Sequence, residues 1–358
     1  MELKDIAIKL NKSKIKAGEG KDNGKYPLFT CSPILNKFLD EYQYDDEAII
    51  VGTGGNVVIN YYKGKFNYST DCLTIKTNED FYTKYIYYFL IANKEKISKM
   101  FRGAGLKHLN KNEFFTIDIK ERNKKEQNEI IKTLDILNKI IENKNNELIK
   151  LDNIVKSQFV EMFGQCNKNI KLGECCEIHA RIGWQALTKA EHMNNGEFML
   201  VTGTDFKNNE INYSTCLFVS KERYDMDKKI ILRNNDILIT KDGTIGKVAI
   251  VHDLPKPATL NSGIFVIRPN EKFVKEYIAY VFKGPLFEDF INKSKTGATI
   301  KHLNQKTLVE FNIPLPPIEL QNQFAEVVKQ IDKQKFEIQQ SLNKTQELYD
   351  SLMSKYFD

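Results

Sequence analysis

Two long stretches of the chain carry apolar residues at alternating intervals of four and three, which is the period of a coiled-coil seam. In the first stretch the seam residues are Ile130, Leu134, Leu137, Ile141, Leu148, Leu151 and Val155, with Lys144 interrupting one position. In the second they are Phe324, Val328, Ile331, Ile338, Leu342, Tyr349 and Leu352, with Lys335 and Thr345 interrupting. Lys, Glu, Asn and Gln fill the flanks, as expected for solvated faces. The pattern predicts long helices over residues 124–163 and 318–358.

The two seams have matched length, which favours pairing of the helices with each other. Pro314, Pro316 and Pro317 are poorly tolerated inside a helix and therefore mark where the second one starts. A whole globular segment connects the helices, so antiparallel pairing is geometrically easy; the alternative is that each helix packs on its own segment. About 38 helical residues at about 1.5 Å each span about 57 Å, so we expect a rod that holds two modules at opposite ends.

The segments before the helices, 1–123 and 164–317, form an internal repeat with them. Residues 103–110 read GAGLKHLN and residues 297–304 read GATIKHLN, and this alignment continues without a gap to the end of the chain. Upstream the match is looser. Residues 49–59 and 237–250 both read as strand, glycine turn, strand, and residues 85–90 and 277–282 both read as a short helix with an aromatic face. We therefore expect two mixed modules on a shared helical scaffold, related by a pseudo-two-fold axis.

Composition limits the classes of function. The length of 358 residues favours two domains, and 53 basic against 47 acidic residues give a formal charge of +6. This balance excludes a wholesale basic surface and leaves room for local basic patches. The longest apolar runs, such as residues 48–51, are too short to span a bilayer, and the first residues lack an apolar signal core, so a cytoplasmic location is expected. None of the six cysteines forms a C-x-x-C pair, which favours reduced thiols.

A search for catalytic or metal-binding motifs leaves no candidate. Residues 243–247 lack the spacing and the Ser or Thr of a phosphate-binding P-loop. Residues 101–105 are faintly like a methyltransferase cofactor loop, but their repeat counterpart at 295–299 loses the pattern. The five histidines are scattered without metal-ligand spacing. We expect neither a catalytic site nor a metal site in this chain.

Glycine turns beside basic and hydroxyl side chains are the remaining functional candidates. They recur in both halves, at 53–56 and 240–247 and again at 102–108 and 295–302. Exposed backbone amides with short polar and basic side chains suit contacts to DNA phosphates and base edges. The alternative is ordinary tight turns with solvated lysines. The candidate nucleic-acid-binding residues are Thr53, Gly54, Asn56, Arg102, Lys107, Thr204, Lys241, Asp242, Thr244, Lys247, Thr299 and Lys301.

Three motifs resemble the DNA-specificity (S) subunit of type I restriction-modification systems. They are residues 313–321 leading into the second helix, residues 236–247, and residues 297–299 followed by Leu303. The resemblance implies an α+β fold with target recognition domains at 1–123 and 164–317, joined by the antiparallel coiled coil of helices 124–163 and 318–358. It also implies that each module reads one half of a bipartite, asymmetric site in double-stranded DNA.

The resemblance further implies that catalysis belongs to partners: two methyltransferase subunits that use S-adenosylmethionine and, where present, an ATP-driven restriction subunit. The helices would dock the methyltransferase subunits, and the expected partner-binding residues are Ile130, Leu134, Leu137, Phe324, Val328 and Ile331. The first half departs from the pattern, because residues 119–123 stand where the second half has its prolines.

Two other classes of function are compatible with the residues. One is a two-headed protein-interaction scaffold on a coiled coil, and the other is a fused enzyme with an unfamiliar site. Salt-dependent binding of duplex DNA would separate a specificity subunit from the scaffold. Methyl transfer by the purified chain alone would support the enzyme.

Overall fold

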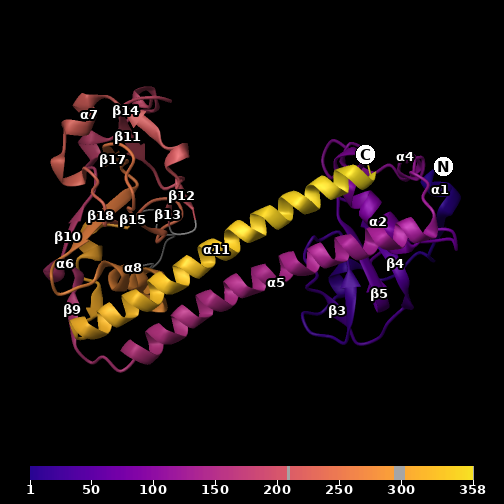
Figure 1. The fold of residues 1–358 in the computed structure, drawn as a ribbon, viewed down its shortest axis with the longest axis horizontal. Helices are drawn as coiled ribbons and strands as arrows, with labels where there is room; N and C mark the ends of the chain where they lie inside the picture. The colour runs from indigo at the N-terminus through magenta and orange to yellow at the C-terminus, as the bar shows by residue number, and fades with distance from the viewer. Residues whose placement is uncertain (208–209, 294–302, 358) are drawn as a thin grey trace. The chain divides into compact units, whose positions relative to one another are not determined.

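The computed structural model of the chain describes residues 1–207, 210–293 and 303–357. They form two compact units, Met1–Glu147 with Ile338–Asp358 and Leu148–Glu337. Each unit holds one globular module together with part of each long helix (Figure 1). The domain boundaries expected from the sequence are 1–123, 124–163, 164–317 and 318–358, whereas the compact units divide both long helices between them.

A six-stranded sheet forms the centre of the module in unit 1. Its order is β1-β6-β4-β5-β2-β3, and every neighbouring pair is antiparallel except β2 with β5. The strands are β1 (Ala7–Lys9), β2 (Tyr26–Phe29), β3 (Phe38–Leu39), β4 (Tyr44–Gly52), β5 (Ile59–Tyr68) and β6 (Cys72–Thr77). Side chains of a strand alternate between faces, and β4 is apolar on both, so it separates two clusters. Ile49 and Val51 belong to the larger cluster, and Ala48 and Ile50 to the smaller.

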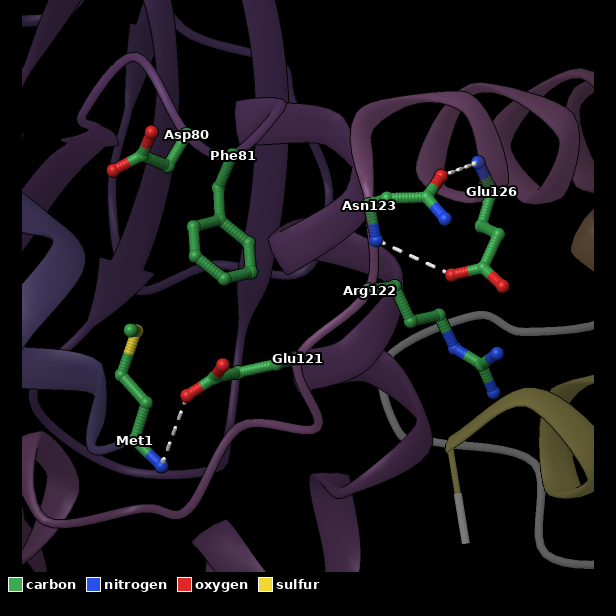
Figure 2. A pocket seen from close by; sticks show the side chains of 7 residues that line it. All are labelled: Met1, Asp80, Phe81, Glu121, Arg122, Asn123 and Glu126. Atoms are coloured by element: carbon green, nitrogen blue, oxygen red, sulfur yellow. Dashed lines mark hydrogen bonds and ion pairs between the residues drawn. The ribbon is translucent and has the colours of Figure 1, made fainter.

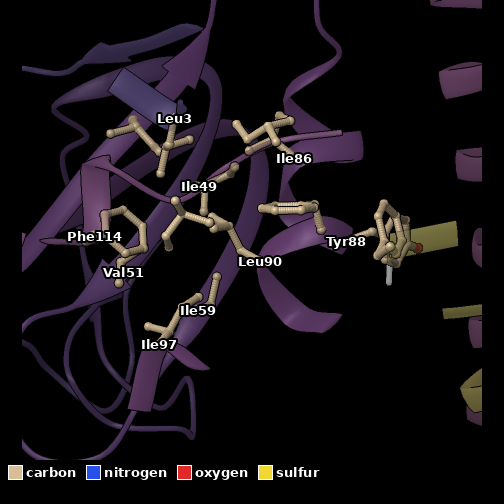
Figure 3. Close-up of a cluster of buried hydrophobic side chains, with 14 of the residues drawn as sticks. Leu3, Ile49, Val51, Ile59, Ile86, Tyr88, Leu90, Ile97 and Phe114 are labelled. Carbon is tan, nitrogen blue, oxygen red and sulfur yellow. The ribbon is translucent and has the colours of Figure 1, made fainter. Parts of the chain in front are cut away.

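Short helices cover the larger cluster of unit 1. They are α1 (Leu3–Ile6), α2 (Thr83–Ala92), α3 (Lys94–Ser98) and α4 (Lys111–Phe115), and a small hairpin joins β7 (Phe101–Arg102) to β8 (His108–Leu109). Figure 3 shows Ile49 and Val51 of the sheet in one cluster with Ile86 and Leu90 of α2. The aromatic segment expected to be a short helix is thus α2, and its inner face is buried.

The module in unit 2 contains two sheets that share one apolar core. One sheet has the order β10-β18-β15-β16, and the other has the order β14-β11-β17 with β11 and β17 parallel. Met199 of β11 and Leu238 of β15 belong to the same buried cluster, so the sheets pack on each other. The strands are β10 (Cys176–His179), β11 (Phe198–Val201), β14 (Leu217–Val219), β15 (Ile237–Thr240), β16 (Val248–Ile250), β17 (Ala258–Leu260) and β18 (Ile264–Pro269).

Smaller elements complete unit 2. Two further strand pairs are β9 (Asn169–Lys171) with β19 (Asn312–Pro314) and β12 (Phe206–Lys207) with β13 (Glu210–Ile211). The helices are α6 (Leu172–Cys175), α7 (Lys221–Asp225), α8 (Lys275–Lys283), α9 (Pro285–Lys293) and α10 (Gln305–Leu308). Helix α8 is the second expected aromatic helix and buries Tyr277, Ile278, Ala279, Val281 and Phe282.

The two long helices are α5 (Lys124–Phe163) and α11 (Ile318–Phe357), each of 40 residues. In unit 1, Leu134 near the start of α5 shares a buried cluster with Phe357 at the end of α11. In unit 2, the rings of Phe159 and Phe163 near the end of α5 lie 5.5 and 5.4 Å from Phe324 near the start of α11. The start of each helix therefore meets the end of the other, which confirms the expected antiparallel pairing.

The seam predicted from the sequence is the buried face of this pair. Every seam residue of both helices is buried or half-buried. Two of the three polar interruptions have partners: Lys335 pairs with Asp152 of the other helix, and the Thr345 hydroxyl donates to the Ser341 carbonyl at 2.8 Å. Such interruptions are typical of positions that fix the register of a coiled coil.

Two fully buried glutamines join the helices to the modules in the same way. Oε1 of Gln127 accepts a hydrogen bond from the Tyr82 amide at 2.9 Å, directly before α2, and Nε2 donates to the carbonyls of Asp80 and Arg122. The repeat pairs Gln127 with Gln321. Oε1 of Gln321 accepts from the Val274 amide at 2.9 Å, directly before α8, and Nε2 donates to the carbonyls of Lys272 and Pro316.

Two buried tyrosines at equivalent positions of the repeat also make equivalent hydrogen bonds. The hydroxyl of Tyr85 in α2 donates to the Lys120 carbonyl at 3.2 Å, and the hydroxyl of Tyr277 in α8 donates to the Pro314 carbonyl at 3.0 Å. Each bond links a module helix to the segment that leads into a long helix. The internal repeat is therefore a repeat of contacts as well as of sequence.

Candidate nucleic-acid interface

The glycine turn of the first module is joined to the hairpin turn that follows β7. Strand β4 ends at Gly52, and both the amide and the hydroxyl of Thr53 donate to the Asp71 carbonyl at 2.8 Å. The Leu109 amide donates to the Thr53 carbonyl at 3.0 Å, and the Gly55 amide donates to the Lys107 carbonyl at 2.9 Å. The structure therefore brings the candidates Thr53, Gly54 and Asn56 together with Lys107.

Two glycines give these turns their shape. Gly55 has a φ of +78°, which favours glycine, and Gly103 has a φ of +149°. A Cβ on Gly103 would also lie 2.6 Å from the carbonyl oxygen of Leu106, so the tight turn requires glycine there. A Cβ on Gly54 would make only ordinary contacts, the nearest at 3.8 Å to the His108 ring. Gly54, the candidate taken from the sequence, is thus less constrained than its neighbour Gly55.

The basic side chains of the first module differ in their surroundings. Nη2 of Arg102 lies 2.7 Å from Oε2 of Glu113, so its charge already has a partner. Lys107 and Asn56 are exposed. The Arg102 pair is itself largely exposed, and such pairs contribute little to stability, so DNA phosphate could replace Glu113 at small cost.

The corresponding turn of the second module is held by Thr240, at the end of β15. Its buried hydroxyl donates to the Thr244 carbonyl at 2.5 Å and accepts from the Lys247 amide at 2.9 Å. Gly243 and Gly246, with φ of +67° and +88°, let the chain reverse between them. The turn presents Thr244 and Lys247 to solvent, whereas Lys241 and Asp242 are half-buried. Thr240 was not among the candidates, because nothing in the sequence shows that its hydroxyl closes the turn.

Two other loops adjoin this turn. The Lys241 amide donates to the Gly263 carbonyl at 2.9 Å, which places the loop after β17 beside it. A Cβ on Gly203 would lie 3.0 Å from Cγ2 of Thr240, so the loop carrying the candidate Thr204 also adjoins the turn. The Thr204 hydroxyl is hydrogen-bonded to that of Thr202 at 2.6 Å. The loop after β17 contains Asn261 and Ser262, two polar residues that the sequence analysis missed because only the tertiary fold brings them here.

One hydrogen bond occurs in both modules and relates the two turns. The Leu109 amide donates to the Thr53 carbonyl at 3.0 Å, and the Leu303 amide donates to the Lys241 carbonyl at 2.9 Å. The repeat pairs Leu109 with Leu303, so Thr53 and Lys241 occupy equivalent positions. The candidates Thr299 and Lys301 lie outside the described residues.

Cys31 lies beside the turn of the first module. Its Sγ would be 3.3 Å from a Cβ on Gly52, and it donates to the Asp71 carbonyl at 3.1 Å. A hydrogen bond from Cys72, helped by the amides of Gly54 and Thr53, lowers the pKa of the Cys31 thiol to about 6 against the opposing effect of burial. Cys31 is therefore the thiol of this turn that ionises near neutral pH.

The six expected partner-binding residues have a different environment. Ile130, Leu134, Leu137, Phe324 and Ile331 are buried and Val328 is half-buried, all in the seam between α5 and α11 or against the modules. Their burial stabilises the helix pair and leaves little of their surface for another subunit. Their role as partner contacts stays a prediction, and this burial does not support it.

A pocket of about 440 Å³ lies in unit 1 where α5 begins (Figure 2). Asn123 and Glu126 exchange hydrogen bonds of 3.2 and 2.9 Å there, which caps the helix. The terminal ammonium of Met1 lies 4.0 Å from Glu121, and Nη2 of Arg122 donates to the Tyr356 carbonyl at 3.0 Å. These contacts cap α5 and join Arg122 to the end of α11, so the pocket is explained by the joint it occupies.

Among residues 1–207, 210–293 and 303–357, no three His, Cys, Asp or Glu side chains are grouped so that they could hold a metal ion. In the same part of the chain, no helix combines the length and the apolar character that crossing a membrane requires.

Comparison with known proteins identifies the family. Residues 1–152 and 167–348 match the family model described as the type I restriction modification DNA specificity domain, so the chain belongs to this family. Specificity subunits are non-catalytic components of type I restriction-modification systems. The chain is therefore a DNA-recognition subunit rather than a fused enzyme, and the interaction scaffold is not favoured.

Two curated relatives have similar sequences. The specificity subunit of the type I restriction enzyme EcoDI of Escherichia coli is 23% identical over 392 residues, covering 98% of this chain and 86% of the relative. The MjaVIII specificity subunit of Methanocaldococcus jannaschii is 23% identical over 270 residues, covering 69% of this chain and 63% of the relative. The second alignment thus leaves more than a third of that relative unmatched.

Solved structures show the same fold. The S subunit of a type I restriction-modification system from M. genitalium is similar with a TM-score of 0.69 and 17% identity, covering 100% of this chain and 95% of that one. A chain from a study of complex assembly in the type I R-M system is similar with a TM-score of 0.54 and 15% identity, covering 100% and 96%. Together with the elements described above, this confirms the expected fold of two mixed modules and paired long helices.

Proposed function

We propose that each module of this chain reads one half of a bipartite, asymmetric site in double-stranded DNA. The observation that carries the proposal is the hydrogen bond shared by the two turns, from Leu109 to Thr53 and from Leu303 to Lys241. This backbone hydrogen bond, which we call the frame of the turn, is the same in both modules. The exposed side chains on it differ: Asn56 in the first module, and Thr244 and Lys247 in the second. Equal frames with different side chains suit two readers of different base sequences.

The proposed contacts are of two kinds. Lys247, Lys107 and Arg102 neutralise phosphates, and backbone amides of the glycine turns assist them. Thr53, Gly54, Asn56, Thr204, Lys241, Asp242 and Thr244 lie on or beside the turns, where polar groups can reach base edges in the major groove. Thr299 and Lys301 belong to the same proposal by the sequence repeat. Lys241 is partly engaged already, with its Nζ 5.3 Å from the centre of the Phe265 ring.

The chemistry of the assembly belongs to other subunits in this proposal. Two modification subunits supply methyl transfer from S-adenosylmethionine, a restriction subunit supplies ATP-driven cleavage, and the assembly works in the cytoplasm. The names of the relatives and of the solved assembly support such partners. Because the seam is buried, docking falls to exposed positions of α5 and α11 such as Ile136 and Phe336, which are 61% and 63% exposed.

The salt dependence of duplex binding tests the proposal. A phosphate contact releases about one counterion, so Lys247→Ala should weaken binding to all sequences alike and reduce the slope of log K against log salt by about 0.9. The matched control is Lys344→Ala, an exposed lysine of α11 outside both modules, which should leave the slope unchanged.

Two results would count against this assignment. A loss confined to one base position would make Lys247 a base reader instead of a phosphate contact. If the wild-type chain, assembled with its modification subunit, binds no duplex DNA at any salt concentration, the protein-interaction scaffold is favoured instead.

A further inference from the structure

Leu106 is a large apolar side chain held out in solvent by a rigid turn. It is 67% exposed and follows Gly103 and Gly105 in the hairpin between β7 and β8. The hairpin is registered by the pairs Phe101 with Leu109 and Arg102 with His108. Gly103, with its φ of +149° and its close approach to the Leu106 carbonyl, sets the course of the turn.

The surroundings of Leu106 are the proposed DNA interface. Its Cδ2 lies 4.0 Å from where a Cβ on Gly54 would be, so it packs over the glycine turn. The next residue, Lys107, accepts a hydrogen bond from the Gly55 amide through its carbonyl. Arg102, Lys107 and His108 are all exposed on the same hairpin. An apolar tip flanked by three basic residues is complementary to a polyanion rather than to an apolar protein surface.

Scattered exposed apolar side chains are normal and need no explanation. Leu106 differs because Gly103 fixes its turn, because the turn is hydrogen-bonded to a proposed reading element, and because its flanks are basic. In the major groove most base-edge groups are hydrogen-bond donors or acceptors, and the apolar group that a base pair offers is the 5-methyl of thymine.

We infer that Leu106 reads a thymine by contact with its methyl group, within the half-site of the first module. The inference rests on the proposed function and adds one base identity to it. Lys107 and Arg102 then hold the phosphates on either side, so that the hairpin presents Leu106 to the groove. In this arrangement, Leu106 is a specificity-determining residue that no hydrogen-bond pattern would show.

Deoxyuridine substitution tests the inference, since deoxyuridine differs from thymidine only by the missing methyl. The full chain, assembled with its modification subunit, is titrated with duplexes of its site in which each thymine in turn is replaced by deoxyuridine. Loss of one buried methyl should weaken wild-type binding about three- to five-fold at one thymine. In the variant Leu106→Ala the same substitution should have no effect, and the thymine duplex should bind as weakly as the deoxyuridine duplex.

The control is Leu286→Ala, a leucine of α9 in the other module that is 43% exposed. It should keep the wild-type response to deoxyuridine at every position. Circular dichroism of the two variants verifies that both fold as the wild type does.

Three outcomes would overturn the inference. They are a wild-type protein that is indifferent to deoxyuridine at every position, a Leu106→Ala protein with an undiminished response, and an equal loss of binding to every duplex by that variant. Each leaves the proposed function standing, because sequence-specific binding persists in the wild type. Absence of sequence-specific binding by the wild type would instead refute the proposed function, and this inference with it.

Discussion

Replacing Gln321 by leucine tests whether buried glutamines hold the long helices to the modules. Gln321 is fully buried, and its side chain makes three hydrogen bonds to backbone groups: the Val274 amide at 2.9 Å and the carbonyls of Lys272 and Pro316 at 3.0 Å. The substitution keeps the size of the side chain and removes all three partners. It therefore separates the hydrogen bonds from the packing.

The magnitude follows from the groups left without partners. Each buried backbone group that loses its partner costs about 1–3 kcal/mol. Because Lys272 is an exposed residue and water can reach its carbonyl, the lower part of that range applies. The leucine offsets about 2 kcal/mol by its own burial. Three groups at about 1.3 kcal/mol each, less this offset, leave about 2 kcal/mol. We expect Gln321→Leu to lower the free energy of unfolding by about 2 kcal/mol, which lowers Tm by about 4–8 °C for a unit of this size.

Urea unfolding followed by circular dichroism is the assay. Gln323→Leu makes the same chemical change at an exposed position of the same helix and should shift stability by less than about 0.5 kcal/mol. Gln127→Leu removes the equivalent hydrogen bonds in unit 1 and should destabilise that unit in the same assay.

Equal stability of Gln321→Leu and Gln323→Leu would refute this reasoning. It would show that water or a shifted backbone satisfies the three groups without the side chain. The hydrogen bonds of Gln321 would then contribute nothing to the stability of the contact between α8 and α11. Packing of Phe324 on Tyr280, with ring centres 5.2 Å apart, would have to stabilise it instead.

Two further predictions concern the turn of the first module and the helices. The pKa of Cys31 is lowered to about 6, chiefly by the hydrogen bond from Cys72, so its alkylation by iodoacetamide should rise with pH through about 6 and level off above. Burial raises the pKa of Cys216 to about 12, so Cys216 should stay unlabelled in the folded protein. Peptide mass spectrometry measures the labelling of both cysteines, and equal labelling at pH 7 would contradict the prediction. Inserting one heptad into the middle of both α5 and α11 adds about 10 Å, and should lengthen the gap between half-sites by about 3 base pairs, whereas an unchanged gap would show that the helices do not set it.

Much of the fold could be predicted because it rests on local patterns. The heptad seam specifies the buried face of α5 and α11 residue by residue, and the prolines before residue 318 fix the start of α11. The aromatic segments became α2 and α8, and the strand–glycine turn–strand patterns became β4 with β5 and β15 with β16. Periodicity and turn chemistry decide these features without reference to the rest of the chain.

The features that the sequence did not indicate depend on contacts between distant residues. The repeat aligns Gln127 with Gln321, but nothing local in the sequence shows that each is buried against a module helix. Asn261 and Ser262 adjoin the turn after β15 because their loop leads into β18, which pairs with β15. The expected partner-binding residues illustrate a related limit. In a sequence, an apolar seam is compatible with pairing inside the chain or with binding of another subunit, and only the structure shows that these residues are buried within the chain itself.

The methylome of a host that expresses this chain tests the central claim most directly. The chain is expressed with its modification subunit in a methylation-free host, and N6-methyladenine is mapped by single-molecule sequencing. Two modules with equal frames and different side chains predict one bipartite motif with two unlike half-sites and a fixed gap. A palindromic motif would contradict the claim that the modules read different sequences, and no methylation in the presence of a folded, bound partner would contradict the claim that the chain specifies DNA sites at all.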